Sequence, residues 1–287
     1  MNQTTSQSMA VIGGGTMGVG IAYVFAVAGW QVYVVEPDAQ RSLGMYQTLK
    51  DAAASGLKRG KLTPEQAGHA SEGVQRVAAV ADLPRFLDLV IESIPERLDL
   101  KLKVLADVDQ RQPRLIATNT SALSINQLAQ AVSDPTHFLG MHFFNPVWSL
   151  PMVEIIRGEH TSEAALAMAR EFAQSTGKTT ITVRDVPGFA TSRLDLIASL
   201  EAMRMLEDGV ASAEDIDHAL VTAYRHPMGP LRLSDIVGLD VRLDIARHLS
   251  QALGPRYAPP RILEEMVAQG HLGQKSGRGF FEWPHKA

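Results

Sequence analysis

Short apolar runs alternate with longer segments of helical periodicity over roughly the first two thirds of the chain. The apolar runs have the length and composition of buried strands, whereas the segments between them repeat apolar residues at helical spacing. Such alternation is typical of β-α-β units, in which crossover helices cover a parallel sheet. We therefore predict an α/β domain with a mostly parallel sheet. The predicted strands span residues 10–12, 32–35, 89–91, 115–117, 137–141, 152–156 and 179–183, and the predicted helices span 16–28, 39–57 and 163–175, with another beginning at 63–65.

The pattern changes at the segment Asp185-Val186-Pro187-Gly188. Beyond it the strand-like runs stop, and only helical spacing remains. This change predicts a domain boundary, with an α/β domain over residues 1–186 and an all-helical C-terminal domain over residues 187–287. The helices predicted for the second domain span residues 189–207, 214–224, 240–253 and 261–269.

A glycine-rich turn follows the first predicted strand and opens the first predicted helix. Its sequence is Gly13-Gly14-Gly15-Thr16-Met17-Gly18. The first glycine of the Gly-x-Gly-x-x-Gly spacing suits a tight turn, the second lets the backbone approach a pyrophosphate, and the third lets helix and strand pack closely. The helix N-terminus also directs backbone N–H groups at the phosphates. The turn therefore predicts a dinucleotide site.

Glu36 indicates which dinucleotide binds. It lies at the end of the second predicted strand, 18 residues beyond Gly18, where an acidic side chain binds the ribose hydroxyls. Because a carboxylate repels a 2′-phosphate, we predict a Rossmann-type domain that binds NAD as its cofactor. The turn and Glu36 supply the expected contacts, which are Gly13, Gly15, Thr16, Met17, Gly18 and Glu36.

Polar residues also follow two later predicted strands. Glu92 comes directly after residues 89–91, and Asn119 and Ser121 follow residues 115–117. Ligands of an open parallel sheet lie outside the carboxyl ends of the strands, so we expect these residues to line the nicotinamide half of the groove. The competing interpretations are a solvated loop carboxylate for Glu92 and helix capping for Asn119 and Ser121.

His142 and Glu154 form the candidate catalytic pair. A histidine whose second ring nitrogen is held by a carboxylate is suited to act as a general base near neutral pH. On a dinucleotide-binding domain, this pair indicates hydride transfer coupled to removal of a proton from an alcohol. A hydrogen-bonded structural histidine at a strand end is the alternative.

Composition excludes several classes of protein. The net charge of −4 argues against a general nucleic-acid binder, and the lack of cysteine excludes disulfides and thiolate metal sites. The histidines lack metal-ligand spacing, so we predict no metal site. No apolar stretch reaches about 18 residues, and the start is unlike a signal peptide, which favours a cytoplasmic protein without membrane contact.

Motifs in both predicted domains occur in a recognisable order and spacing. They occupy residues 11–18, 90–92, 95–96, 119–121, 140–146, 153–154, 186–189, 227–230, 235, 238–240 and 273–280. With these motifs the chain resembles the L-3-hydroxyacyl-CoA dehydrogenase family, especially its short bacterial 3-hydroxybutyryl-CoA dehydrogenases. The resemblance covers nearly the whole chain.

The resemblance implies a role for each matching residue. His142 would be the general base on the substrate hydroxyl, and Glu154 would orient it. Ser121 would hydrogen-bond the substrate oxygen, and Asn145 would lie beside the nicotinamide. The family also implies a small-molecule substrate, here an acyl-CoA of fatty acid metabolism, and a homodimer formed through the helical domain.

Departures from the family pattern bear on the substrate. Ser192 replaces a family asparagine that helps bind substrate, Ala122 replaces a serine, and Trp148-Ser149 replaces a proline and a small aliphatic residue. Lys58 and Lys61 either meet CoA phosphates or merely balance a helix C-terminus. The open alternatives are a small non-CoA hydroxy acid or alcohol, of the carnitine or gulonate type, and a non-catalytic NAD-binding protein.

Overall fold

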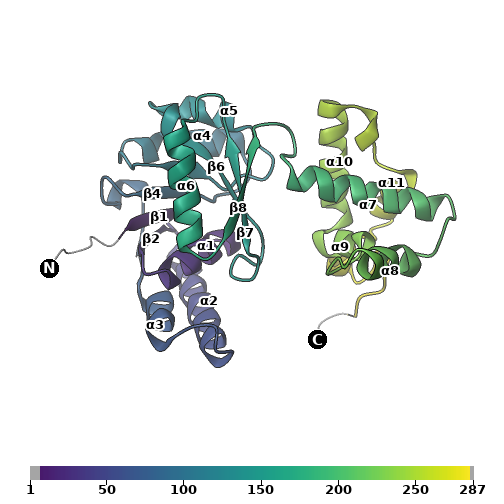
Figure 1. Ribbon diagram of the computed structural model, residues 1–287, viewed down its shortest axis with the longest axis horizontal. Coiled ribbons are helices and arrows are strands. Elements are labelled where there is room, and N and C mark those ends of the chain that lie inside the picture. The colour runs from purple at the N-terminus through teal and green to yellow at the C-terminus, as the bar shows by residue number, and fades with distance from the viewer. Residues whose placement is uncertain (1–6, 285–287) are drawn as a thin grey trace. The chain divides into compact units, whose positions relative to one another are not determined.

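The computed structural model describes residues 7–284 and divides into two compact units, which Figure 1 colours from purple to teal and from green to yellow. The first unit ends at Val186 and the second begins at Pro187. Each has its own hydrophobic core. The first is built on a sheet and the second on helices, which confirms the predicted fold class.

The sheet of the first unit has eight strands in the order β3-β2-β1-β4-β5-β6-β7-β8. Neighbouring strands are parallel except β6 and β7, which are antiparallel. The sheet is therefore mostly parallel, as predicted. Its strands are β1 (Ser8–Ile12), β2 (Gln31–Val35), β3 (Val74–Val77), β4 (Leu89–Glu92), β5 (Ile116–Thr118), β6 (Phe138–Phe143), β7 (Met152–Arg157) and β8 (Thr179–Arg184).

Two strand predictions need correction. The sequence pattern did not reveal β3, whose burial is confined mainly to Val74. The strand predicted over 137–141 runs to Phe143, because pairing with β7 continues to the Phe143–Val153 register. His142 therefore lies inside a strand and not beyond its end.

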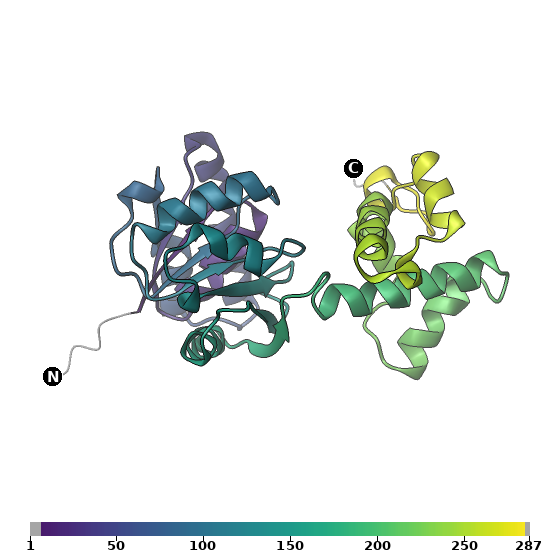
Figure 2. The ribbon, with the colours of Figure 1, turned by 90° about the horizontal axis from the view of Figure 1, so that it is seen from above.

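Helices lie on both faces of the sheet (Figure 2). Their starts agree with local capping: Asp38 accepts the backbone N–H of Gln40 and Arg41 at the start of α2, and Thr63 forms a capping box with Gln66 at the start of α3. The helices of this unit are α1 (Thr16–Val27), α2 (Ala39–Lys58), α3 (Pro64–Glu72), α4 (Leu98–Asp109), α5 (Ile125–Leu128) and α6 (Glu163–Ser175).

Helix α1 is the centre of the first core. All its residues from Gly18 to Ala26 are buried. Gly18 is needed for this packing, since a Cβ built there would lie 1.9 Å from the carbonyl oxygen of Gly13. Just after the C-terminal end of α1, Trp30 packs edge-on against Phe25 and Phe172, which joins α1 to α6.

The second unit is all helical across its described residues. Its apolar core is built mainly from helical residues and also holds Tyr257 and Phe281. Asp235 is fully buried and accepts the backbone N–H of Phe280 and Phe281 and the indole N–H of Trp283, which fixes the C-terminal segment. The helices are α7 (Thr191–Glu207), α8 (Ala213–Ala223), α9 (Pro230–Val237), α10 (Leu239–Leu253) and α11 (Arg261–Ala268).

Three of the helices were not predicted from sequence, α4 and α5 in the first unit and α9 in the second. Of the helices in residues 7–284, none has both the length and the apolar character needed to span a bilayer.

Candidate active site

His142 and Glu154 face each other across the antiparallel pair β6–β7. The strand register places the two residues directly opposite, and His142 Nδ1 lies 3.1 Å from Glu154 Oε2. Both are buried, with Glu154 at 0% exposure. A carboxylate at Nδ1 favours the tautomer whose proton is on that nitrogen, so Nε2 is the basic position. This geometry suits a general base.

The phenylalanines beside His142 complete its surroundings. Phe143 is buried, and the ring of Phe144 lies tilted against the imidazole, with ring centroids 4.4 Å apart. Asn145 follows and is exposed. The chain therefore passes directly from the buried base to a polar side chain that a ligand can reach.

Asn119 links the end of β5 to the end of β6. Its Oδ1 accepts the backbone N–H of Phe143 at 2.8 Å, and its Nδ2 donates to Ser93 Oγ at 3.3 Å. Its own backbone N–H donates to the carbonyl of Glu92 at 2.7 Å. The residue predicted to contact the cofactor thus also fixes the strand end that carries His142.

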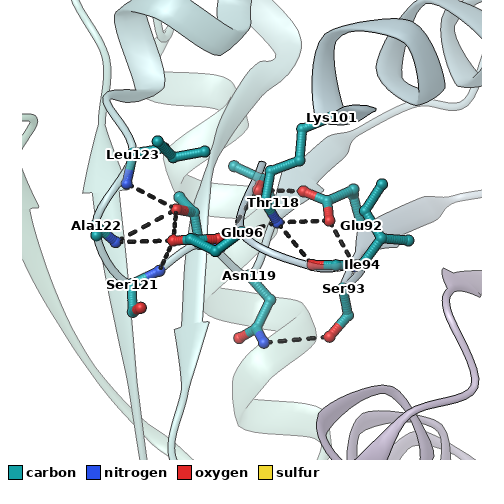
Figure 3. A network of polar contacts seen from close by, with 11 residues as sticks. Glu92, Ser93, Ile94, Glu96, Lys101, Thr118, Asn119, Ser121, Ala122 and Leu123 are labelled. Atoms are coloured by element: carbon teal, nitrogen blue, oxygen red, sulfur yellow. Dashed lines mark hydrogen bonds and ion pairs between the residues drawn. The ribbon is translucent and has the colours of Figure 1, made fainter. Parts of the chain in front are cut away.

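Ser121 lies in a turn that Glu96 organises (Figure 3). Glu96 Oε1 accepts the Thr120 hydroxyl at 2.5 Å and the backbone N–H groups of Ser121 and Ala122 at 3.0 Å each. Ser121 itself is exposed at the surface of the first unit. Glu96 was not predicted as a site residue, because the turn that it contacts is distant in sequence.

The surroundings of Glu96 affect its ionisation. Partial burial raises the pKa of Glu96, but the Thr120 hydroxyl, the charge of Lys101 and the Ser121 N–H outweigh this effect and hold the pKa below its usual range. Glu96 is therefore an anion near neutral pH, as its acceptor role in the turn requires.

The structure corrects the expectation that Glu92 lines the nicotinamide groove. Glu92 is 0% exposed, and its carboxylate is occupied by Lys101 Nζ at 2.7 Å, by the Thr118 hydroxyl at 2.6 Å and by the backbone N–H of Ile94 at 2.7 Å. Lys101 is itself 1% exposed and also contacts Glu96 Oε2 at 3.2 Å. Glu92 is thus part of a buried ionic network beneath the Ser121 turn (Figure 3).

The glycine-rich turn has the geometry that a pyrophosphate needs. Gly13 has a φ of +108°, and α1 begins at Thr16 after the N-cap Gly15, which has no side chain to cap it, so its first N–H groups point outward. Among the described residues, no atom lies within 4 Å of a Cβ built at Gly15. Gly15 and Thr16 are exposed, and Met17 is half-buried. These residues fit the phosphates of a dinucleotide.

Glu36 joins this turn, since its Oε2 accepts the backbone N–H of Gly14 at 3.3 Å and its Oε1 accepts that of Asp38 at 2.9 Å. Arg41 approaches to 3.6 Å, and Arg76 donates to the backbone carbonyl of Glu36 at 2.8 Å. The Glu36 side chain is therefore held at the turn by these contacts, a suitable place for the ribose hydroxyls.

A cavity of about 520 Å³ lies between α1, α2 and the segment after β6. Trp148 stands edge-on to Tyr23 in its wall, with ring centroids 5.8 Å apart. Arg59 and Lys61 also line it, whereas Lys58 is exposed at the last turn of α2 and does not. Of the two predicted lysines, the structure places only Lys61 at this cavity.

Ser192, the remaining predicted substrate residue, lies in the first turn of α7 in the second unit and is half-buried. Within residues 7–284 no group of three or more His, Cys, Asp or Glu residues is arranged to hold a metal ion.

Comparisons with known proteins identify the family of the chain. The family model for the NAD binding domain of 3-hydroxyacyl-CoA dehydrogenase matches residues 8–186, and the model for the C-terminal domain matches residues 188–283. The fold and the site thus define an NAD-binding oxidoreductase. The chain belongs to the 3-hydroxyacyl-CoA dehydrogenase family, which confirms the resemblance seen in the sequence.

The matches to individual relatives extend over both units. The chain is 40% identical to a 3-hydroxybutyryl-CoA dehydrogenase of Mycobacterium tuberculosis, over 96% of this chain and 98% of the relative. It is 35% identical to a probable 3-hydroxybutyryl-CoA dehydrogenase of Bacillus subtilis, over 98% of each. The crystal structure of (S)-3-hydroxybutyryl-CoA dehydrogenase from Ralstonia eutropha superposes with a TM-score of 0.92 at 36% identity, over 98% of this chain and all of that one.

Proposed function

We propose that this protein is an NAD-dependent L-3-hydroxyacyl-CoA dehydrogenase that oxidises the 3-hydroxyl of short-chain substrates to the 3-ketone. The observation that carries the proposal is the buried pair His142–Glu154, at 3.1 Å, in the same unit as the dinucleotide turn. The names of the full-length relatives support the substrate class. Enzymes of this substrate class serve fatty acid metabolism, and we place the protein in the cytoplasm.

In this mechanism the side chains of the protein accept and return one proton. His142 Nε2 takes the proton of the substrate hydroxyl, while Glu154 holds Nδ1 and stabilises the imidazolium that forms. The hydroxyl of Ser121 hydrogen-bonds the same substrate oxygen. Bound NAD supplies the acceptor for the hydride that leaves C3. In the reverse direction, protonated His142 returns the proton to the ketone oxygen.

Other residues position the two ligands. We assign the cofactor to Gly13, Gly15, Thr16, Met17, Gly18 and Glu36, with Asn119 and Asn145 at its nicotinamide end. Glu92 takes no part in this contact, because it is fully buried beneath the Ser121 turn.

The cavity beside Trp148 supports a CoA ester as substrate. Two cations, Arg59 and Lys61, line it and suit the phosphates of CoA. Lys58 would act only as a nearby charge, because it stands outside the cavity lining. We further assign Ser192 to substrate binding. We assign the helical unit to substrate binding and to the interface of a homodimer. Light scattering that shows a monomer would contradict the dimer.

The decisive experiment follows NADH formation with three substrates: 3-hydroxybutyryl-CoA, free 3-hydroxybutyrate and carnitine. We expect turnover of the CoA ester far above that of the free acid and of carnitine. His142→Gln should lower kcat by at least about 10², because general-base catalysis contributes roughly 10²–10⁴, and should leave the affinity for NAD unchanged.

The matched control is His137→Gln. His137 is more exposed, contacts Asp134 near the start of β6, and should tolerate the change with normal kcat. No turnover of any CoA ester by the unaltered protein would overturn the proposed substrate. A near-normal rate in the His142 variant would show that another group is the base.

A further inference from the structure

Lys178 is a buried cation that the proposed mechanism does not use. It directly precedes β8 and is 6% exposed. Its Nζ donates to the backbone carbonyls of Val147 at 2.6 Å and Leu150 at 2.7 Å. Among the described residues no carboxylate lies within ion-pair distance of it, so its partners are neutral. Burial accordingly lowers the pKa of the Lys178 ammonium.

The two carbonyls are the ends of the segment Val147–Leu150, called here the Trp148 turn. Backbone hydrogen bonds from Ser149 and Leu150 to the carbonyl of Pro146, at 3.0 and 3.1 Å, give the segment its local form. The Lys178 ammonium connects both ends of the turn to the start of β8, and Lys178 also lines the cavity. The Lys178 side chain therefore holds the turn through hydrogen bonds to the backbone of the turn.

The other anchor of the turn is packing. Val147 is 2% exposed and lies against Gly20 of α1, where an added Cβ would come within 2.8 Å of the valine side chain. The next residue, Trp148, is 39% exposed and leans edge-on against Tyr23. The turn thus has a fixed inner face and presents Trp148 and Ser149 to the cavity.

We propose that Lys178 is a positioning residue for acyl-CoA binding: by holding both ends of the Trp148 turn, it fixes Trp148 against Tyr23 and sets the width of the cavity. The inference rests on the proposed function, because it takes this cavity as the site of the CoA ester. Lys178 does not touch the reacting atoms, so its loss should impair binding of the CoA ester and not the chemical step.

The test compares Lys178→Met, which removes the donors at similar length, with Lys178→Arg, which keeps the charge and the donors. In Lys178→Met, KM for 3-hydroxybutyryl-CoA should rise about tenfold, while kcat and KM for NAD change less than about twofold. Lys178→Arg should restore most of the loss. The control Lys103→Met, at an exposed lysine of α4, should match the unaltered protein.

Fluorescence gives a readout that does not depend on substrate. Because Trp30 and Trp283 also emit, the emission of Trp148 is obtained by subtraction. The emission of each protein carrying Trp148→Phe is subtracted from that of the same protein with Trp148 present. Acrylamide should quench this signal more strongly in Lys178→Met than in the unaltered protein. Lys178→Gln, which keeps an amide donor, replaces the methionine variant if that variant does not fold.

Each of these measurements can overturn the inference. An unchanged KM for the CoA ester in a folded Lys178 variant, even with a lowered melting temperature, would reduce Lys178 to a structural role and overturn the inference alone. Unchanged quenching of Trp148 would do the same. Failure of the unaltered protein to turn over any CoA ester would overturn the proposed function, and the inference with it.

Discussion

Lys101→Met removes the cation at the centre of the buried network below the Ser121 turn. The ammonium is 1% exposed and lies 2.7 Å from Glu92 and 3.2 Å from Glu96. It also donates to the carbonyl of Ile94 at 3.1 Å. Methionine preserves most of the side-chain volume, so the change tests the charge and its hydrogen bonds and not the packing.

Loss of one partner from a buried ion pair costs roughly 3–5 kcal/mol, because the other charge stays buried without compensation. Glu92 keeps hydrogen bonds from the Thr118 hydroxyl and the Ile94 N–H, and the Glu96 side chain is 36% exposed. Both facts favour the low end of this range, so Lys101→Met should lower the free energy of unfolding by about 3 kcal/mol. For a unit of this size the melting temperature should fall by about 6–12 °C.

Calorimetric melting of the variant and two companions checks this value. Lys103→Met, on the exposed side of the same helix, should remain within about 0.5 kcal/mol of the unaltered protein. Adding Glu92→Gln to Lys101→Met should recover part of the loss, since a neutral amide tolerates burial better than a lone carboxylate. If Lys101→Met melts together with Lys103→Met, the buried pair contributes nothing and the reasoning is wrong.

The remaining predictions concern two carboxylates, Glu96 and Glu36, at the proposed ligand sites. Because the pKa of Glu96 lies below its usual range, its charge stabilises the fold above the ordinary glutamate range, and this contribution is lost as pH falls through the lowered pKa. Glu96→Gln should therefore melt below the unaltered protein at about pH 7, and the difference should shrink as pH falls through the lowered pKa of Glu96; a difference that stays constant with pH would refute this. Glu36→Ala removes a carboxylate that repels a 2′-phosphate and leaves Arg41, whose Nε lies 3.6 Å from it, in place, so the ratio of kcat/KM for NADP over NAD should rise about tenfold. An unchanged ratio in cofactor-titration kinetics would argue that Glu36 does not select the cofactor.

Local sequence signals were sufficient for the parts of the molecule whose buried residues form continuous, mainly apolar runs. The strands β1, β2 and β4 are continuous apolar runs, and α1 is buried through its whole middle, so composition alone revealed them. The glycine turn could also be predicted, because its steric demands permit few other residues. The fold class and the dinucleotide site follow from these elements.

Helix α4 was missed for a specific physical reason. Its buried face carries Lys101 beside Leu105 and Val108, so a lysine interrupts the apolar stripe that periodicity detects. The charge is tolerated only because Glu92 and Glu96 meet it, and these partners lie outside the helix. The same missing helix explains the error at Glu92: without Lys101 in place, a carboxylate at a strand end looks like a ligand group.

The candidate site shows the same division between local pattern and tertiary contact. His142 and Glu154 could be paired from sequence because they lie on two antiparallel strands, β6 and β7, that follow each other in the chain. Glu96 accepts the Thr120 hydroxyl and the backbone N–H groups of residues 121 and 122, about 25 positions away, and no periodicity encodes such contacts. Lys178 holds Val147 from 31 positions away in the same manner. Residues that position other residues were therefore the ones that sequence reasoning missed.

Asn119 shows why this site needs such positioning groups. The sheet hydrogen bonds between β5 and β6 end at the Thr118–Gly140 register, before the chain reaches Ser121 on one strand and His142 on the other. Beyond that point only side chains can keep the two strands in register, and the Asn119 amide does so by accepting the N–H of Phe143. Since a misplacement of about 1 Å between reacting groups can cost about 10² in rate, the separation of Ser121 from His142 depends on this amide as much as on the catalytic groups themselves.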